Sequence, residues 1–313
     1  MIKKYIRRFK FTYIIYNFFQ KKKLYHNEVI YKKLGLRKKY YSSISSKSFV
    51  DIPNVLGPSV YTKNLASCSL YNTLSQEGKR SLDDFSENGF SIIKNYLSTE
   101  QVNTINAEIE SLIDSKKVKF SYGNKIMFAI HSSQFLSEIG NDKKLVELLS
   151  VLLGGEAILF QSINFLMGSE QHTHSDSIHM TTYPLGGLLG VWIALEDIDG
   201  DNGPLHYYPG SHKLPYYLNA DYNNEGNAFL IGDKSYDEYE NMINDKIKEF
   251  SINKVIFKAS KGDLLIWHAN LFHGGEPHLN KDKTRKSMVF HYFKKDAICY
   301  HEITQRPALI TKY

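Results

Sequence analysis

The segment Gln171-His172-Thr173-His174-Ser175-Asp176, within residues 160–183, places metal-binding residue types between short apolar, strand-like runs. His174 and Asp176 are two residues apart, so on an extended strand both side chains leave the same face. An imidazole and a carboxylate on one face supply two ligands of a 2-His-1-carboxylate site, which leaves coordination positions open on Fe(II). Alone the pair is a weak signal, because 12 His and 33 acidic residues produce such spacings by chance. The segment predicts a β-rich fold whose metal site needs a third ligand.

The third ligand is predicted in residues 261–293, which read KGDLLIWHANLFHGGEPHLNKDKTRKSMVFHYF. This stretch holds His273 and, twelve residues later, Arg285. Arg285 and Ser287 are again two residues apart, so a cationic fork and a hydroxyl on one strand face are suited to grip a carboxylate. The two stretches together predict a metal site formed by His174, Asp176 and His273, with an anion site at Arg285.

The pattern of apolar runs indicates a mainly β fold with helical additions, in a globular region that begins near residue 81. Residues 81–156 are predicted to be helical, with a capping box at Ser98 and Gln101 and a second helix at Lys143–Leu153. Residues 157–300 alternate short apolar runs with Gly, Pro and Asn turns, which is typical of an antiparallel sandwich or barrel. Residues 216–250 form a polar, helix-prone insertion that is suited to act as a lid.

Charge is distributed unevenly along the chain. Residues 1–40 carry 13 of the 39 Lys and Arg and only one of the 33 acids, so they have a net charge of +12. The remainder has 26 bases against 32 acids, and this mildly acidic body argues against nucleic acid as a partner. The basic residues alternate with aromatics, notably around FTYIIYNFF at residues 11–19. Two interpretations stay open for this tail: peripheral contact with an anionic membrane, or packing on the body without any membrane role.

Other features set limits on the class of protein. The longest apolar run is too short to span a bilayer, and a secretory signal is not expected. Cys68 and Cys299 match no metal or redox spacing, so they are interpreted as free thiols in a reducing, cytoplasmic compartment. Residues 41–80 are rich in Ser, Asn and Tyr and are expected to form an extended linker or wrapping segment.

Four stretches carry a resemblance to a known family: ENGFSIIKNYLSTEQV, GSEQHTHSDS, VWIALEDIDGDNGPLHYYPGSHKLP, and KGDLLIWHANLFHGG followed by Arg285. With these, the chain resembles the phytanoyl-CoA dioxygenase family of Fe(II)- and 2-oxoglutarate-dependent oxygenases from about Phe85 to Phe293. The resemblance implies a double-stranded β-helix core, a cupin-like jelly roll flanked by helices. It implies iron ligation by His174, Asp176 and His273.

The resemblance also assigns roles around the metal. Arg285 matches the position that pairs with the distal carboxylate of 2-oxoglutarate, and Ser287 is a helper. Trp192 and Gln161 match positions that face the co-substrate, although core packing is an open alternative for Trp192. His179 and Tyr183 are candidates for substrate contact. His172 is an additional imidazole for which the family implies no role.

The implied activity is hydroxylation of a small-molecule, lipid-linked or glycan-linked substrate, with O2 consumed and succinate and CO2 released. Asp176 favours hydroxylation, because halogenating relatives replace this carboxylate. A non-catalytic cupin-like binding or structural protein is the principal alternative. A zinc hydrolase with the same three ligands is a weaker one, because it gives Arg285 no function and has no evident general base.

Overall fold

The computed structural model describes residues 8–52 and 64–310. The basic residues Lys3, Lys4 and Arg7 of the tail and the prolines Pro53 and Pro58 of the expected linker lie outside this described part. Free thiols are found at both cysteines, which are buried. None of the helices in the described part is long and apolar enough to cross a bilayer.

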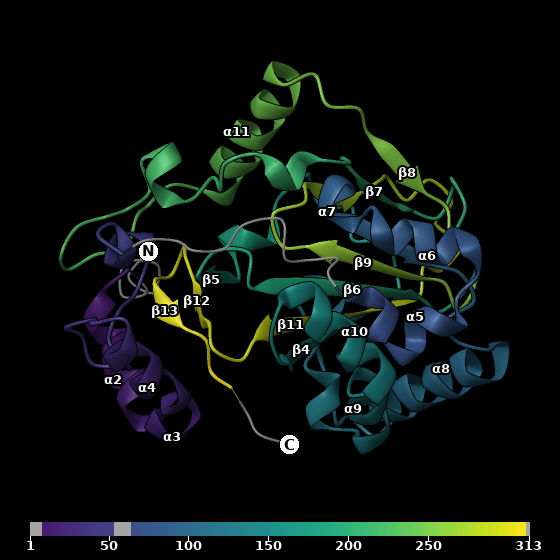
Figure 1. Ribbon diagram of the computed structural model, residues 1–313, viewed down its shortest axis with the longest axis horizontal. Coiled ribbons are helices and arrows are strands. Elements are labelled where there is room, and N and C mark those ends of the chain that lie inside the picture. The colour runs from purple at the N-terminus through teal and green to yellow at the C-terminus, as the bar shows by residue number, and fades with distance from the viewer. Residues whose placement is uncertain (1–7, 53–63, 311–313) are drawn as a thin grey trace.

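Among the described residues, the main sheet contains seven strands, and every neighbouring pair is antiparallel (Figure 1). In spatial order they are β1 (Phe90–Ile93), β9 (Leu264–His268), β6 (Leu188–Ala194), β11 (Ser287–Lys294), β4 (Ala157–Phe165), β3 (Lys125–Met127) and β2 (Phe120–Ser121). Sequence neighbours are rarely sheet neighbours in this order, so long connections cross between layers, as in a jelly roll.

Two smaller sheets complete the β structure. One consists of β10 (His273–Gly275), β7 (Leu205–Tyr207) and β8 (Val255–Phe257). The other consists of β13 (Arg306–Pro307), β12 (Ile298–His301) and β5 (Thr181–Tyr183). Side chains of β6, β9 and β11 meet those of β7 and β8 in one buried cluster, so the first small sheet faces the main sheet across a packed interior. The predicted mainly β jelly-roll architecture is confirmed.

The central strand β6 shows why both faces of the main sheet are buried. Its side chains alternate: Leu189, Val191 and Ile193 face the helices, whereas Trp192 and Ala194 face the sandwich interior. A strand covered on both faces is apolar throughout, which explains why this run showed no polar alternation.

Helices cover the outer face of the main sheet (Figure 1). They are α5 (Ser69–Thr73), α6 (Gln76–Asp83), α7 (Phe85–Asn88), α8 (Thr99–Asp114), α9 (Gln134–Gly140) and α10 (Lys143–Leu153). The capping box at the start of α8 is confirmed, because the Ser98 hydroxyl accepts from the Gln101 amide while the Gln101 side chain accepts from the Ser98 amide. The predicted bounds of α10 are confirmed as well. Short 3-10 helices occur at η1 (Ser46–Phe49), η3 (Leu65–Ser67), η4 (Ala129–His131), η5 (Asp176–Ile178), η6 (Ser211–Lys213) and η7 (Asn219–Tyr222).

Residues 41–80 were expected to be an extended linker or a wrapping segment, and the extended linker is wrong where the structure describes this part of the chain. The segment contains η1, η3, α5 and the start of α6, and Leu70 is buried in the main core. These helices have one or two turns each, too few for an apolar period to be visible in the sequence.

The N-terminal segment folds as α2 (Lys10–Phe19), α3 (Lys21–Leu24) and α4 (His26–Lys33), which form a group at one end of the molecule (Figure 1). Backbone hydrogen bonds join it to the body: the Lys10 amide donates to the Phe229 carbonyl, and the Ile231 amide donates to the Arg8 carbonyl. Tyr31 packs with β5 and β12. The described part of the basic tail is therefore an ordered addition to the fold.

Residues 216–250 contain η7 and α11 (Tyr236–Glu249), which lies above the sandwich (Figure 1). Tyr239 and Ile243 of α11 are buried against Ile178 and Phe272. The insertion thus packs beside the segment that carries the predicted metal ligands, and its function as a lid stays a prediction.

Candidate metal centre

The three predicted ligands lie together in the interior. The ligand atoms of His174, Asp176 and His273 are all within 4.8 Å of one another, and all three residues are buried. The Nε2 atom of each histidine lies 3.8 Å from Oδ1 of Asp176. His174 and His273 are brought side by side by reciprocal backbone hydrogen bonds of 2.9 Å, although they are 99 positions apart in the chain.

The local backbone at this site differs from the predicted strand. His174 lies in an isolated bridge, and Asp176 begins the 3-10 helix η5. The intervening Ser175 is extended, with φ −109° and ψ 137°, and its hydroxyl accepts from the Ser177 amide to start the turn. One extended residue is enough to direct the side chains on either side of it to the same face, so His174 and Asp176 share a face although they lie in no regular strand. Their binding of a metal stays a prediction.

Hydrogen bonds set the orientation of both imidazoles. Nδ1 of His174 lies 2.9 Å from the His172 carbonyl, and Nδ1 of His273 lies 2.9 Å from the Leu271 carbonyl. A carbonyl oxygen only accepts, so each Nδ1 donates and each Nε2 keeps its lone pair toward Asp176. Burial, together with the proximity of the second imidazole at His273, holds the pKa of His174 well below its ordinary value, which keeps this imidazole neutral as a metal ligand must be.

The two oxygens of Asp176 have different surroundings. Oδ2 accepts a 2.8 Å hydrogen bond from the indole Nε1 of Trp267 and lies 3.5 Å from Nε2 of His291, whereas Oδ1 faces the two ligand histidines. Burial alone raises the pKa of Asp176, but its interactions with His273 and its hydrogen bond with His291 outweigh burial, and the net pKa lies below the ordinary carboxyl value. The carboxylate is thus ionised and presents one oxygen to a metal.

Gly190 allows Trp267 to reach this position. The two residues are paired across strands β6 and β9, and a Cβ at Gly190 would overlap the indole ring. Only glycine leaves the space that the ring occupies above β6.

Arg285 lies in the same cavity as the three ligands. The cavity has a volume of about 80 Å³, and its lining includes His174, Asp176, His273, Trp192 and Arg285. The guanidinium Nη1 donates to Ser287 Oγ at 2.6 Å. Its Nε is buried and finds no hydrogen-bond partner, and in the described part of the chain no carboxylate forms an ion pair with it. Burial lowers the pKa of Arg285 to about 10, so it is a charged group at neutral pH.

The remaining predicted site residues are placed differently. Trp192 lines the cavity. Gln161 is paired with His291 across β4 and β11, so the two side chains lie on the same face of the sheet, but Gln161 is not among the residues that line the cavity. His179 is beside the centre, with its ring centroid 6.1 Å from that of His174 and 4.8 Å from that of Tyr236 on α11. Its predicted contact with substrate stays a prediction.

Tyr183 does not line the metal cavity, and its expected contact with substrate stays a prediction. Its ring stacks on Phe49 at a centroid distance of 4.1 Å, and its hydroxyl donates to the Ile52 carbonyl at 2.7 Å. Tyr183 follows the metal motif in sequence, but η5 intervenes and turns the chain toward the N-terminal segment.

Sequence reasoning missed three residues of the site. Trp267 and His291 surround Asp176, and Lys125 of β3 lines the cavity, where its Nζ donates to Gln171 Oε1 at 2.8 Å. The period of two in β11 would have found His291, because Arg285, Ser287, Val289 and His291 share one strand face. No signal in the sequence places Lys125 there, since β3 reaches the site through sheet pairing alone.

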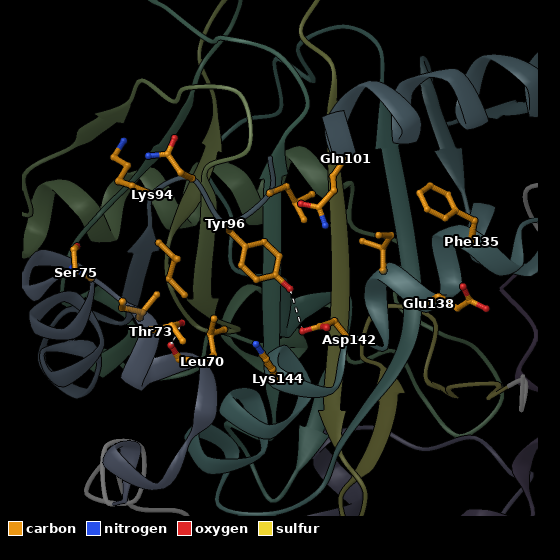
Figure 2. A pocket seen from close by; sticks show the side chains of 16 residues that line it. Leu70, Thr73, Ser75, Lys94, Tyr96, Gln101, Phe135, Glu138, Asp142 and Lys144 are labelled. Carbon is orange, nitrogen blue, oxygen red and sulfur yellow. Dashed lines mark hydrogen bonds between the residues drawn. The ribbon is translucent and has the colours of Figure 1, made fainter. Parts of the chain in front are cut away.

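A larger cavity of about 600 Å³ lies elsewhere, between β1 and the helices of the outer face. Figure 2 shows Tyr96 directed toward Asp142, and Lys94, Gln101 and Lys144 are among the other lining residues. It shares no lining residue with the metal cavity, because the main sheet separates the two.

Comparisons with known proteins agree with this geometry. The model of the family "Phytanoyl-CoA dioxygenase (PhyH)" matches residues 85–287. The chain is 26% identical over 264 residues to ectoine dioxygenase of Halomonas elongata, a match that covers 73% of this chain and 74% of the relative. Phytanoyl-CoA dioxygenase domain-containing protein 1 of Danio rerio is 34% identical, in a match that covers 29% of this chain and 33% of that protein. Its namesake in Rattus norvegicus is 28% identical, in a match that covers 54% of this chain and 56% of that protein.

Two solved structures share the fold. The alpha-ketoglutarate-dependent carbocyclase SnoK from nogalamycin biosynthesis has a TM-score of 0.59 and 20% identity, with 73% of this chain and 87% of that chain covered. EctD from S. alaskensis with 2-oxoglutarate and 5-hydroxyectoine has a TM-score of 0.56 and 17% identity, with 76% and 81% covered. At these identities the likeness supports the fold alone.

Family model, relatives and metal-binding residues agree on one class of protein. The chain is an Fe(II)- and 2-oxoglutarate-dependent dioxygenase, a class of enzyme that uses iron, 2-oxoglutarate and O2. Because the family model spans about two-thirds of its length, the chain belongs to the phytanoyl-CoA dioxygenase family.

Proposed function

We propose that this dioxygenase hydroxylates an organic small molecule at the buried centre described above. In this proposal His174, Asp176 and His273 hold Fe(II), and Arg285 holds the distal carboxylate of 2-oxoglutarate. The observation that carries it is Arg285: a buried guanidinium, without a carboxylate partner among the described residues, in the cavity of the three ligands. An uncompensated buried cation is costly, so an anionic occupant is expected.

The donor set fits ferrous iron. Two neutral imidazoles with Nε2 lone pairs and one carboxylate oxygen leave room for a bidentate 2-oxo acid and oxygen, and this is the set typical of such oxygenases. When bound, iron and 2-oxoglutarate supply the oxidising chemistry, in which co-substrate decarboxylation accompanies substrate oxidation. The chain supplies orientation and a site that excludes water.

The residues around the three ligands orient Asp176 and form the part of the cavity that would bind the co-substrate. Trp267 and His291 bind Oδ2 of Asp176 and so direct Oδ1 to the metal. Phe165 lies against the guanidinium of Arg285, 5.3 Å from ring centroid to Cζ, and forms an apolar wall for the co-substrate. Lys125 adds a second positive charge at the same cavity. Together these groups define one end of the site as the co-substrate end.

The substrate is proposed to approach from the opposite side of His174. There His179 lies between the ligand histidine and Tyr236 of α11, with the His301 ring 5.6 Å away. Polar aromatic groups are suited to a polar small molecule, either free or as part of a lipid- or glycan-linked compound. Hydroxylation is favoured by Asp176 and by the relationship to ectoine dioxygenase.

The experiment tests metal and co-substrate together. Fe(II) and 2-oxoglutarate added without oxygen are expected to give a visible charge-transfer band in wild-type protein. Oxygen is then expected to produce succinate, at a rate that rises when the correct candidate substrate is added.

His174→Ala should abolish the band, because it removes one metal ligand. His172→Ala should retain it, because His172 is an exposed imidazole whose contribution to the site is its backbone carbonyl. A band of equal intensity in both variants, or no band and no succinate in the wild type, would overturn the proposal and favour a binding protein without turnover.

A further inference from the structure

The N-terminal helices expose an unusual number of large apolar side chains. Of the seventeen large hydrophobic residues that are exposed in the described part of the chain, eight lie within residues 9–29. They are Phe9, Phe11, Ile15, Tyr16, Phe18, Phe19, Tyr25 and Val29. Soluble surfaces rarely gather apolar residues in this way unless the patch binds something.

Four of these eight side chains form one face of α2. Phe11, Ile15, Phe18 and Phe19 follow helical spacings of four, three and one, so they lie on the same side. The helix turns its other side inward, where Asn17 is buried and its Nδ2 donates to the Tyr41 carbonyl at 3.2 Å. Phe229, whose side chain is 78% exposed, lies near the start of α2, because its backbone carbonyl accepts from the Lys10 amide.

Basic residues surround this apolar face, which we call the α2 face. Residues 8–40 contain ten Lys and Arg and one acid, Glu28, which is engaged by Lys32 at 3.1 Å. Lys22 and Lys23 are exposed in α3, within four residues of Phe19, and the Lys21 ammonium lies 3.6 Å from the centroid of the Phe18 ring. Lysines next to exposed aromatic rings are typical of peripheral contact with anionic lipid, with the rings at the interface and the lysines at the headgroups.

The charge distribution of the chain selects one orientation. Residues 41–313 carry 26 bases and 32 acids, whereas the α2 end is strongly positive. An anionic surface therefore attracts the α2 end and repels the acidic body. The group of α2, α3 and α4 also lies at one end of the molecule, where a flat surface reaches it (Figure 1). A nucleic acid would satisfy the lysines but would leave the exposed phenylalanine and isoleucine side chains without an apolar environment.

We propose that the α2 face docks this dioxygenase peripherally on an anionic lipid membrane. No helix of the described part spans a bilayer, so the contact is at the surface and reversible. Docking would also act on the site's surroundings, because residues 229–231, which bond to the start of α2, lead directly into α11 beside His179.

Binding to vesicles tests the proposal with the full chain. We expect cosedimentation with phosphatidylcholine vesicles that contain phosphatidylglycerol, and little with pure phosphatidylcholine. Lys22→Glu with Lys23→Glu should weaken partitioning roughly 20-fold or more, since one lysine near an anionic surface contributes about fivefold. Lys117→Glu with Lys119→Glu changes the net charge equally at exposed sites near the β2–β3 turn and should have little effect.

A second pair of variants tests the apolar contribution. Phe11→Ser with Phe19→Ser, at positions 68% and 77% exposed, should remove most of the binding that persists at high salt. Phe120→Ser with Tyr122→Ser is the matched control at exposed aromatics elsewhere. All four double variants should keep the charge-transfer band, because none touches the metal centre, so a loss of membrane binding is distinguishable from a failure of the enzyme.

Three results would overturn the proposal. Equal binding to both kinds of vesicle, or no binding to either, removes the anionic membrane as the partner. Equal losses in the α2-face variants and their controls show that the α2 face is not the contact. A dimer in sedimentation velocity that the Phe11 and Phe19 substitutions convert to monomer, with vesicle binding unchanged, assigns the face to self-association.

Discussion

The hydrogen bond from Trp267 to Asp176 is predicted to control the affinity for iron. Trp267→Phe keeps an aromatic ring on β9 but removes the indole N–H that lies 2.8 Å from Oδ2. Among the described residues, the contact that then remains near that oxygen is the longer one of 3.5 Å to His291. A hydrogen bond to a charged group contributes about 1.5–3 kcal/mol, and loss of a partner that orients a metal ligand typically weakens metal binding about 10–100-fold. We expect the dissociation constant for Fe(II) to rise within that range.

The measurement is an anaerobic competition titration of Fe(II) against a chromophoric chelator, without 2-oxoglutarate. Trp192→Phe is the matched control, because the chain has two tryptophans and Nε1 of Trp192 is buried without a hydrogen-bond partner in the described structure. It should bind Fe(II) within about twofold of wild type, since it loses the same atoms and no bond to a ligand.

A third variant, Gly190→Ala, tests the placement of the indole ring separately from the presence of its N–H group. It leaves the indole in the chain but forces the ring away from β6, so it should weaken Fe(II) binding as Trp267→Phe does. If Trp267→Phe and Trp192→Phe bind Fe(II) equally well, the inferred role of the indole in directing Oδ1 is refuted.

Two further predictions concern the co-substrate and the stability of the protein. Arg285→Lys should raise the apparent KM for 2-oxoglutarate by about 10-fold or more, because a lysine cannot form the two parallel hydrogen bonds of a guanidinium with a carboxylate. The affinity for Fe(II) should change less. A KM equal to that of the wild type in succinate-release assays would contradict the role of Arg285 in binding the anion. The metal-free protein should lose stability below pH 6.5. Burial, with a smaller effect of His212, lowers the pKa of His268 to about 3, so the folded state stays neutral while the unfolded imidazole, with a pKa of about 6.5, takes up a proton. The contribution of neutral His268 to the free energy of unfolding is fully present above pH 6.5 and is lost as the pH falls toward 3. Between pH 6.5 and pH 5 the loss is about 2 kcal/mol. His268→Asn keeps an acceptor for the Asn270 amide and should reduce that loss in urea unfolding at the two pH values; an unchanged loss contradicts the assignment.

Much of the fold followed from local patterns that physics ties to single elements. The Ser98–Gln101 capping box and the apolar face of α10 predicted helices that the structure contains, because caps and amphipathic faces are properties of neighbouring residues. The short helices of residues 46–83 were missed, because one or two turns that pack on the core take their stability from tertiary contacts.

Part of the site could also be predicted from the sequence, because some of its residues are close neighbours along the chain. The His174–Asp176 spacing and the Arg285–Ser287 spacing are local, so the sequence already indicated which residues share a face. Tyr183 shows the limit of this reasoning: closeness in sequence suggested the site, whereas the turn at η5 directs its ring to Phe49.

The amino-acid sequence alone determined the residue types of the centre, their spacing and the mainly β character of the chain. Only the tertiary structure decided which groups surround Asp176, since Trp267 and His291 reach it from strands β9 and β11 that pair through the sheet. It also decided that Arg285 is buried without a carboxylate partner in the described chain and that the α2 face is exposed. Whether a side chain is buried, and which groups it contacts, depends on the segments that pack over it. Both are therefore decided only when distant parts of the chain have packed together.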